Sequence, residues 1–302
     1  MTLESLHILL TYRCPYECDH CFVWGSPRQT GVFTLDHLSE VFHQALAVKS
    51  VYEFYFEGGE TFVYYPVLLK AVAEASTLGF RTALVSNGYW ASSVKDARVW
   101  LERLVEVGLD RIELSVDAFH GDEVWPPSAH PGVVAAEQLG LDVGVIHLDP
   151  PCEVRDGEGA QAGERLEGGG IMFRGRAAAK LTEGLPRRPW DSFTCCPYEA
   201  LADPGRLHVD PFGNLHLCQG LTLGNLLEQP LDLIMASYDP SAHPVVGPLL
   251  AGGPAKLVDT YRLAHEDTYV DACHLCYTSR EMLRSRFPAY LGPDQMYGVV
   301  CE

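Results

Sequence analysis

The chain has 302 residues, of which 47% are hydrophobic and 21% are charged, as in ordinary folded proteins. This composition excludes disordered and low-complexity classes. The 22 Lys and Arg residues against 40 Asp and Glu residues give a net charge of −18, which opposes binding to nucleic acid and to anionic membranes. We therefore expect neither a nucleic acid nor a membrane as a partner.

The start of the chain and its hydrophobic runs predict a cytoplasmic protein. No apolar run approaches the roughly 18 residues of a membrane span, and the first four residues lack the basic start of a secretory signal. In a reducing compartment, ten cysteines are unsuited to a disulfide framework. We therefore expect their spacing to indicate metal ligation or catalysis.

Short β-rich runs alternate with helical patterns up to about residue 176, which is typical of a parallel sheet with crossover helices. The predicted strands cover residues 6–10, 51–56, 81–85, 111–116, 141–146 and 170–173. The predicted helices cover residues 35–48, 65–77, 94–107 and 133–139. Residues 149–169 are rich in Gly and indicate an irregular loop, either functional or a tolerated surface insertion.

The pattern changes after residue 177. Residues 206–210 and 214–218 alternate with period two around a Pro-Phe-Gly turn, which predicts a β-hairpin. A cysteine pair precedes this hairpin and a cysteine-bearing helix follows it, while the Pro- and Gly-containing residues 239–254 predict a loop or linker. We place a domain boundary here, with one domain over 1–185 and a smaller α+β domain over 186–302.

Three cysteines lie in the loop directly after the first predicted strand, at Cys14, Cys18 and Cys21. Loops at the carboxyl ends of parallel strands are where such sheets place their chemistry. Three thiolates can bind three corners of an iron–sulfur cube and leave the fourth iron open to a cofactor or substrate. The alternative is a zinc site closed by His20 or by a distant residue.

The C-x3-C-x2-C spacing of this loop resembles the hallmark of the radical S-adenosylmethionine (SAM) superfamily. The resemblance implies an α/β fold with a partial (β/α)6 TIM-like barrel, and a [4Fe–4S] cluster on Cys14, Cys18 and Cys21 that binds SAM through its open iron. It also implies reductive cleavage of SAM to methionine and a 5′-deoxyadenosyl radical, which takes hydrogen from a substrate. His20 lies where the family usually has an aromatic residue near the adenine.

The run Gly58-Gly59-Glu60 follows the second predicted strand and resembles the family's GGE motif. The resemblance implies that its glycines allow close backbone approach and that its acid helps to hold the methionine amino group of SAM. A Gly-Gly turn is common at strand ends, so the motif gains its value from its position next to the cysteine loop.

Polar residues also follow the third, fourth and sixth predicted strands. The resemblance implies that those after the third and fourth strands face SAM or substrate, whereas turn formation and capping are the alternatives. These residues are Ser86, Asn87, Ser115 and Asp117. Arg174 lies in a segment similar to the family's sixth-strand GRA run and is expected to contact a carboxylate of the cofactor, or to pair with a surface acid.

The second cysteine group resembles the shortened SPASM domain called twitch. Either Cys195 or Cys196, together with Cys218, Cys273 and Cys276, makes four thiolates, with Cys196 the preferred choice of the pair. Four thiolates saturate an auxiliary [4Fe–4S] cluster, which favours electron transfer, while a four-cysteine zinc site is the alternative. Cys152 and Cys301 have no assigned role; a lone cysteine is typically a packed residue.

Two clusters together predict an enzyme whose overall reaction is an oxidation. The first hypothesis is dehydrogenation of a small polar metabolite such as an aminocyclitol or sugar, with the auxiliary cluster as electron acceptor. The alternative is a maturase that modifies or crosslinks a peptide or protein, and the third is a catalytically silent metal-binding scaffold. Reductive SAM cleavage also implies a one-electron donor protein such as flavodoxin or ferredoxin.

Overall fold

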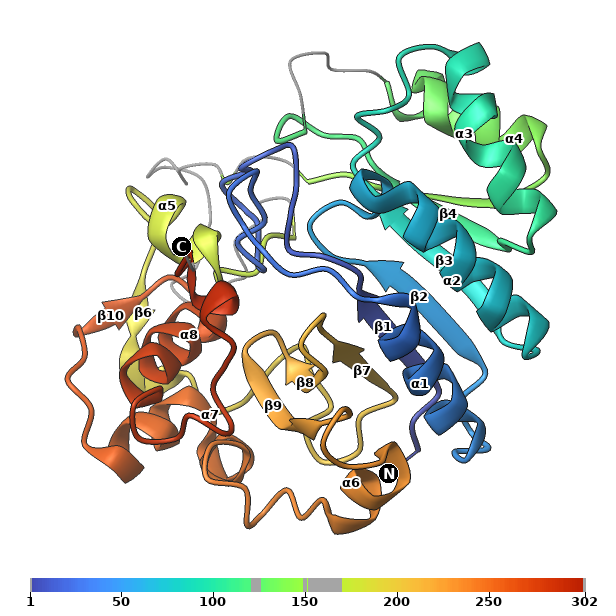
Figure 1. Ribbon diagram of the computed structural model, residues 1–302. Helices are drawn as coiled ribbons and strands as arrows, with labels where there is room; N and C mark the ends of the chain where they lie inside the picture. The colour runs from blue at the N-terminus through green and yellow to red at the C-terminus, as the bar shows by residue number, and fades with distance from the viewer. Residues whose placement is uncertain (1, 121–125, 149–150, 152–169, 301–302) are drawn as a thin grey trace.

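The computed structural model describes residues 2–120, 126–148, 151 and 170–300. At its centre lies an eight-stranded sheet in the order β5-β4-β3-β2-β1-β7-β8-β9 (Figure 1). Its strands are β1 Ser5–Leu9, β2 Glu53–Glu57, β3 Arg81–Ser86, β4 Arg111–Ser115, β5 Asp142–Ile146, β7 Arg206–Val209, β8 Asn214–Cys218 and β9 Leu221–Asn225. Neighbouring strands from β5 to β7 in this order are parallel, and β8 and β9 continue the sheet antiparallel. A separate antiparallel pair joins β6 (Arg188–Pro189) to β10 (Thr268–Tyr269).

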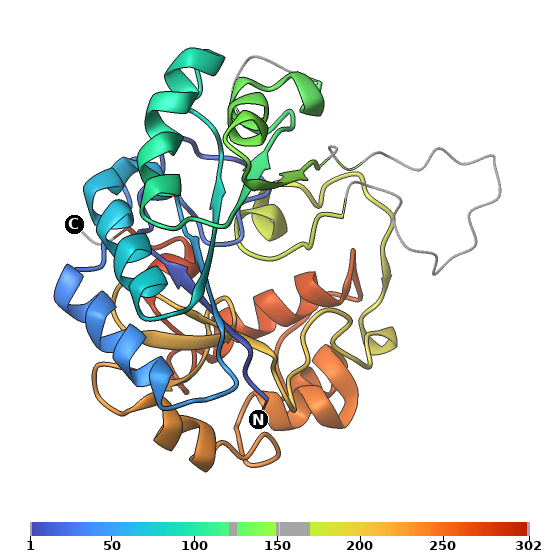
Figure 2. The same cartoon turned by 90° about the vertical axis from the view of Figure 1, so that its right-hand side faces the viewer.

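Helices cover both faces of this sheet. The helices are α1 Leu35–Leu46, α2 Tyr65–Thr77, α3 Val94–Glu106, α4 Pro131–Gln138, α5 Arg176–Lys180, α6 Leu231–Ser237, α7 Val246–Tyr261 and α8 Ala272–Leu283. Figures 1 and 2 show α1 to α4 along the outer face of the parallel strands, while α7 and α8 lie across the molecule from them. Side-chain caps fix two of the crossover helices, since Thr34 accepts from the His37 backbone N–H and Ser93 from that of Asp96.

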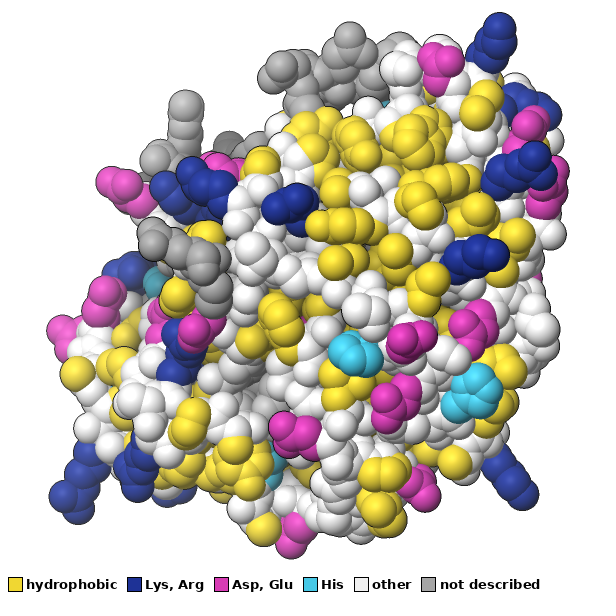
Figure 3. All heavy atoms as spheres, viewed as in Figure 1, with side chains coloured by type: hydrophobic (Ala, Val, Ile, Leu, Met, Phe, Trp, Pro, Cys, Tyr) yellow, Lys and Arg dark blue, Asp and Glu magenta, His cyan; other side chains and the backbone are white. Residues whose placement is uncertain are grey.

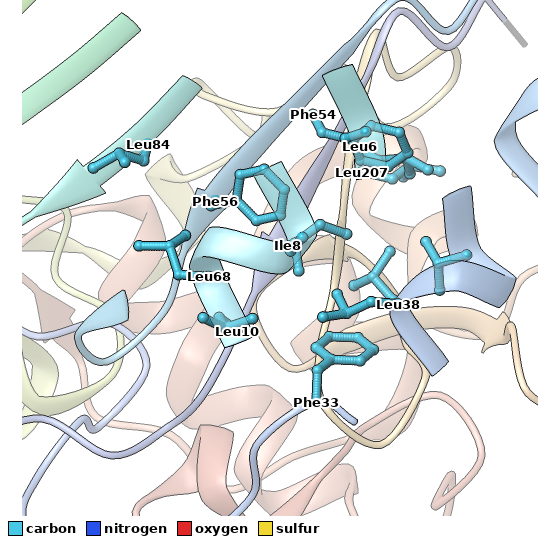
Figure 4. Packing of buried hydrophobic residues seen from close by; sticks show 14 of the residues in the cluster. Leu6, Ile8, Leu10, Phe33, Leu38, Phe54, Phe56, Leu68, Leu84 and Leu207 are labelled. Atoms are coloured by element: carbon cyan, nitrogen blue, oxygen red, sulfur yellow. The ribbon is translucent and has the colours of Figure 1, made fainter. Parts of the chain in front are cut away.

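Alternation along the strands separates an apolar outer face from a polar inner face. Leu6, Ile8, Phe54 and Phe56 are fully buried and pack beneath α1 and α2 (Figure 4). His7 lies between Leu6 and Ile8, and successive side chains of a strand point to opposite faces. The outer face therefore forms the main core, and the inner face is left to polar side chains.

The first five predicted strands and the four predicted helices are confirmed, with ends displaced by at most two residues. The sixth strand predicted at 170–173 is wrong, because the described chain has no strand there. Gly170 has a φ of +69°, and Ile171 and Phe173 pack with Val270 in a separate hydrophobic cluster instead of joining the sheet. The place beside β1 belongs to β7.

The loop predicted over 239–254 is only partly present, because α7 begins at Val246. Gly252 and Gly253 have non-helical backbone angles and kink this helix immediately before Pro254. Gly253 has a φ of +65°, and a Cβ there would lie 2.3 Å from the backbone nitrogen of Cys195. Gly253 therefore allows a close approach to the cysteine pair. It lies in the segment that composition alone had indicated as a linker.

The predicted division at residue 185 falls between α5 and β6, and it stays a prediction, since β7 pairs directly with β1. Cys152, Cys301 and most of the 149–169 loop lie outside the described residues. In the described ranges, no helix has the length and apolar character that a membrane crossing requires. Acidic and basic side chains are interspersed on the face drawn in Figure 3.

Substitution of Leu207 tests whether the carboxyl-terminal part of the chain shares the main hydrophobic core. It is fully buried on β7 in the cluster that contains Leu6 and Phe54 (Figure 4). We expect Leu207→Ala to lower the free energy of unfolding by about 2–5 kcal/mol, because it leaves a cavity between β7 and β1. The measurement is urea unfolding followed by circular dichroism.

The matched control is Leu233→Ala, since Leu233 is 52% exposed on α6. We expect a change of about 0.5 kcal/mol or less for this variant. Equal effects of the two substitutions would contradict a core shared by β7 and β1.

Candidate functional site

The three cysteines of the first loop lie at the carboxyl end of β1 and receive backbone hydrogen-bond donors. The Tyr16 N–H lies 3.4 Å from Cys14 Sγ, and the Gly25 N–H donates to Cys21 Sγ at 3.2 Å. Burial raises the pKa of Cys14 above its ordinary value and that of Cys18 to about 12. These thiols therefore ionise only when a cation is bound to them, as metal ligands do.

The Gly58-Gly59-Glu60 run packs directly on the cysteine loop. The Gly59 N–H donates to the Thr11 carbonyl at 2.6 Å, and the Glu60 N–H donates to the Arg13 carbonyl at 2.9 Å. A Cβ on Gly59 would lie 2.4 Å from the Arg13 carbonyl oxygen. This contact requires glycine, and it holds the end of β2 against the loop that follows β1.

Glu60 is the centre of a buried hydrogen-bond network. Its carboxylate accepts from the Phe62 N–H at 3.0 Å, the Ser86 hydroxyl at 2.8 Å and the Asn87 N–H at 2.8 Å. Burial raises the pKa of Glu60 to about 7 despite these donors. Since the Asn87 side-chain amide also lies 3.5 Å from Cys14 Sγ, the structure brings Glu60, Ser86 and Asn87 together with the first cysteine.

His120 contacts both His20 and Asp117. The His20 ring lies 5.1 Å from the ring of His120, whose Nδ1 is 2.7 Å from Asp117 Oδ1. Burial lowers the pKa of His20 to about 4, and among the described residues nothing hydrogen-bonds its buried Nδ1. Burial alone would raise the pKa of Asp117, but the hydrogen bond and charge of His120, together with the Phe119 N–H, hold it below its ordinary value. Ser115 ends β4, two residues before Asp117.

The second cysteine set lines one cavity. Its members come from the loop before β7, the end of β8 and the first two turns of α8: Cys196, Cys218, Cys273 and Cys276. Cys273 and Cys276 are three residues apart on α8 and are therefore neighbours on its surface. Cys195 is exposed and does not line this cavity.

Arg174, which was expected to contact a carboxylate of the cofactor or to pair with an acid, lies with the second cysteine set. Its Nη1 is 3.0 Å from Cys218 Sγ and 3.1 Å from Glu199 Oε1. The reason is Gly175, which has a φ of +61° and whose Cβ would lie 2.5 Å from Phe22 Cα. At this turn the chain presses against the first loop and directs Arg174 toward the second set.

Two contacts missed by the sequence analysis join the first loop to α5 and to α8, the helix that carries Cys273 and Cys276. Arg176 donates to the carbonyls of Cys18 and Gly25, each at 2.8 Å. The Trp24 indole donates to the Tyr277 hydroxyl at 2.8 Å, and Tyr277 follows Cys276 in the chain. Two sequence features could have indicated these contacts. Arg176 lies in the GRA run, and Tyr277 directly follows Cys276.

The spacing of the thiols distinguishes a cluster from a single ion. Four sulfurs at about 2.3 Å from one zinc ion lie about 3.8 Å apart. Among the described residues, three ligand atoms within 4.8 Å of one another occur only at His7, Glu57 and His208. Each cysteine set is therefore spread more widely than a single zinc ion needs, which fits a larger metal group such as an iron–sulfur cube.

The His7, Glu57 and His208 side chains form a polar cluster on the inner face of the sheet. His208 Nδ1 lies 2.6 Å from Glu57 Oε1, and His7 Nδ1 lies 3.4 Å from Glu57 Oε2. Burial alone would raise the pKa of Glu57, but the two histidines hold it below its ordinary value. The sequence analysis missed this cluster because its members come from three strands, although His7 is a polar residue inside an apolar strand.

Comparison with known proteins agrees with this geometry. Residues 8–131 match the model of the radical SAM superfamily, a range that includes Cys14, Cys18, Cys21 and Glu60. This range is similar to the radical SAM domain over about two fifths of the chain. The match ends before β5 and the second cysteine set, so the similarity to radical SAM proteins rests on the cysteine loop and the strands from β1 to β4.

The individual proteins that this chain resembles share little sequence identity with it. A Bacillus subtilis (strain 168) protein named as the peptide biosynthesis protein YydG is 26% identical over 117 residues, which span 39% of this chain and 37% of that protein. The structure of BtrN in complex with AdoMet and 2-DOIA has a TM-score of 0.51 at 14% identity, covering 78% of this chain and 82% of BtrN. Native anSMEcpe with bound AdoMet has a TM-score of 0.43 at 13% identity, covering 94% and 97%. The likeness to BtrN shows a shared fold.

Gly59→Ala tests the close packing of the GGE run on the cysteine loop. We expect this substitution to lower the free energy of unfolding by about 2 kcal/mol or more and to reduce iron binding, because the added methyl overlaps the Tyr12 and Arg13 carbonyls. Thermal unfolding and the iron content of anaerobically reconstituted protein measure the two effects.

Gly205→Ala is the control, because nothing lies within 4 Å of a Cβ at Gly205. We expect its stability to change by about 0.5 kcal/mol or less and its iron content to stay at the wild-type value. Wild-type stability and iron content in Gly59→Ala would show that the two loops do not need this contact.

Proposed function

We propose that the chain is a radical SAM oxidoreductase that uses two [4Fe–4S] clusters. The observation that carries this proposal is the coexistence of a three-thiol loop and a four-thiol cavity in one chain. Three thiolates leave one metal position for a cofactor, whereas four thiolates fill all positions and favour electron transfer. The two sets therefore have different tasks.

In this proposal Cys14, Cys18 and Cys21 hold the first cluster, which binds SAM at its open iron. When bound, the first cluster and SAM together would supply a 5′-deoxyadenosyl radical that takes a hydrogen atom from the substrate. Glu60 lies next to this loop and has a pKa of about 7, so it can hold the SAM amino group or its proton. His20 offers a buried ring with an unsatisfied nitrogen toward the same cofactor.

The second cluster is held by Cys196, Cys218, Cys273 and Cys276 in a twitch-like arrangement of hairpin and helix. Loss of a hydrogen atom from an alcohol carbon leaves a carbon radical, which becomes a ketone when it gives up one electron and the hydroxyl proton. The second cluster is the proposed acceptor of that electron. The Trp24–Tyr277 hydrogen bond supports this arrangement by joining the first loop to α8, which carries two thiols of the second set.

We favour a small polar metabolite, such as an aminocyclitol or sugar, as the substrate class. The polar inner face of the sheet, with His7, Glu57 and His208, supplies hydrogen-bonding groups for such a molecule. The fold shared with BtrN, which was crystallised with AdoMet and 2-DOIA, agrees with this choice. A flavodoxin or ferredoxin is the proposed electron donor, and the cytoplasm the proposed compartment.

The second candidate is a maturase of a peptide or protein, favoured by the sequence match to the peptide biosynthesis protein YydG. A short precursor peptide encoded beside the gene, and its modification by the reconstituted enzyme, would favour this candidate over the first. A metal-binding scaffold without activity would yield no 5′-deoxyadenosine from SAM and a strong reductant, and that result would contradict both enzymatic candidates.

The division of tasks predicts different defects in two cysteine variants. We expect Cys14→Ala to lose one cluster and all SAM cleavage, because the SAM-binding iron has lost a ligand. We expect Cys218→Ala to lose the other cluster and product formation but to retain SAM cleavage. The measurements are iron content and 5′-deoxyadenosine yield after anaerobic reconstitution, and equal loss of cleavage in both variants would contradict the division.

The cysteine pair provides a matched test of the second set. We expect Cys196→Ser to lose about half of the bound iron, because one of two four-iron clusters loses a ligand. We expect Cys195→Ser to keep the wild-type iron content, since Cys195 is exposed and outside the cavity. The opposite result would assign the ligand to Cys195.

A further inference from the structure

Two arginine side chains are buried against the second cysteine set. Arg174 is 4% exposed and Arg280 is 1% exposed, and both line the cavity formed by the four cysteines. Burial of a guanidinium group is costly, because the charge leaves water for a medium of low dielectric constant. Each of these charges therefore needs compensation nearby.

Arg174 forms an ion pair with a carboxylate, whereas Arg280 does not in the described residues. Glu199 Oε1 lies 3.1 Å from Arg174 Nη1. Within the described part of the chain, no carboxylate forms an ion pair with Arg280, whose Nη1 donates to the Gln219 carbonyl at 2.8 Å. The acidic groups that interact with Arg280 include the thiols of Cys218 and Cys276 and two tyrosine hydroxyls. Glu281 interacts with Arg280 without forming an ion pair, so this carboxylate and the ionised thiols together compensate the charge of Arg280.

The first cysteine set has fewer guanidinium groups beside it. The carboxylates of Glu60 and Asp117 interact with Cys14 and Cys18, respectively, and oppose their ionisation. Arg176 is the cation near this set, where it acts on Cys18. The first set is therefore bordered by Glu60, Asp117 and one guanidinium, and the second by two guanidiniums and the carboxylates of Glu199 and Asp271.

We propose that Arg280 and Arg174 raise the reduction potential of the second cluster and so make it the electron acceptor of the reaction. Reduction adds one negative charge to a cluster, and a buried cation stabilises the reduced form more than the oxidised form. The Arg174 guanidinium, 3.0 Å from Cys218 Sγ, also donates a hydrogen bond to a ligand sulfur, which acts in the same direction. This inference rests on the proposed function, because it requires a cluster in the second set.

The test is a redox titration of the second cluster in the holoenzyme, followed by electron paramagnetic resonance. Its signal is identified as the one missing from Cys218→Ala. We expect Arg280→Gln and Arg174→Gln each to shift the reduction equilibrium at least tenfold toward the oxidised form, or about 59 mV for a one-electron couple. We expect Glu199→Gln to shift it in the opposite direction, because it removes the negative partner of Arg174.

Arg286→Gln is the control, since Arg286 is an exposed arginine beyond α8 that lies over the ring of Tyr261. Its potential is expected to equal that of the wild type. If Arg280→Gln fails to fold, the opposite shifts of Arg174→Gln and Glu199→Gln still decide the question.

The outcomes separate this inference from the function on which it rests. A wild-type protein that holds only four iron atoms, all on the first loop, would contradict the proposed function. A second cluster whose potential is unchanged in Arg174→Gln and in folded Arg280→Gln, or shifts in the same direction in Arg174→Gln and Glu199→Gln, would overturn the inference and leave the function intact.

Discussion

The ionisation of buried thiols is the constraint on which the rest of the structure depends. Burial raises the pKa of Cys14, Cys18, Cys196, Cys273 and Cys276, so these side chains are neutral unless a cation compensates their charge. Iron supplies that compensation in a cluster, and each ligand sulfur in turn needs donors around it. The backbone N–H groups at the first loop and the arginines at the second set are these donors.

The sheet makes both sets part of one molecule. The carboxyl ends of β1, β2 and β3 bring the cysteine loop, Glu60 and Asn87 together, while the pairing of β7 with β1 attaches the hairpin that carries Cys218. The turn at Gly175 then directs the two neighbouring arginines to different sites. Arg174 lies against Cys218, and Arg176 donates to the backbone of the first loop.

The two sets differ in the number of thiols and in the number of guanidinium groups beside them, and the proposed function uses both differences. Three thiols leave room for a cofactor at the barrel edge, and acids near them oppose added negative charge. Four thiols close the second set, and its arginines favour added negative charge. In the proposed oxidation, the electron left on the substrate needs an acceptor, which a cluster in the second set would provide.

The sequence by itself determined what depends on residues close together in the chain: the three-cysteine loop, the Gly58-Gly59-Glu60 run and the alternating strands and helices of the first 146 residues. Local spacing and periodicity are set by covalent geometry, so they can be seen in one chain. Only the tertiary structure decided that Cys196 and not Cys195 lines the cavity, and that Arg174 faces Cys218. It also replaced the sixth strand with β7 and assembled His7, Glu57 and His208. These outcomes depend on contacts between residues as far apart as Trp24 and Tyr277, whose separation of 253 positions no local pattern can bridge.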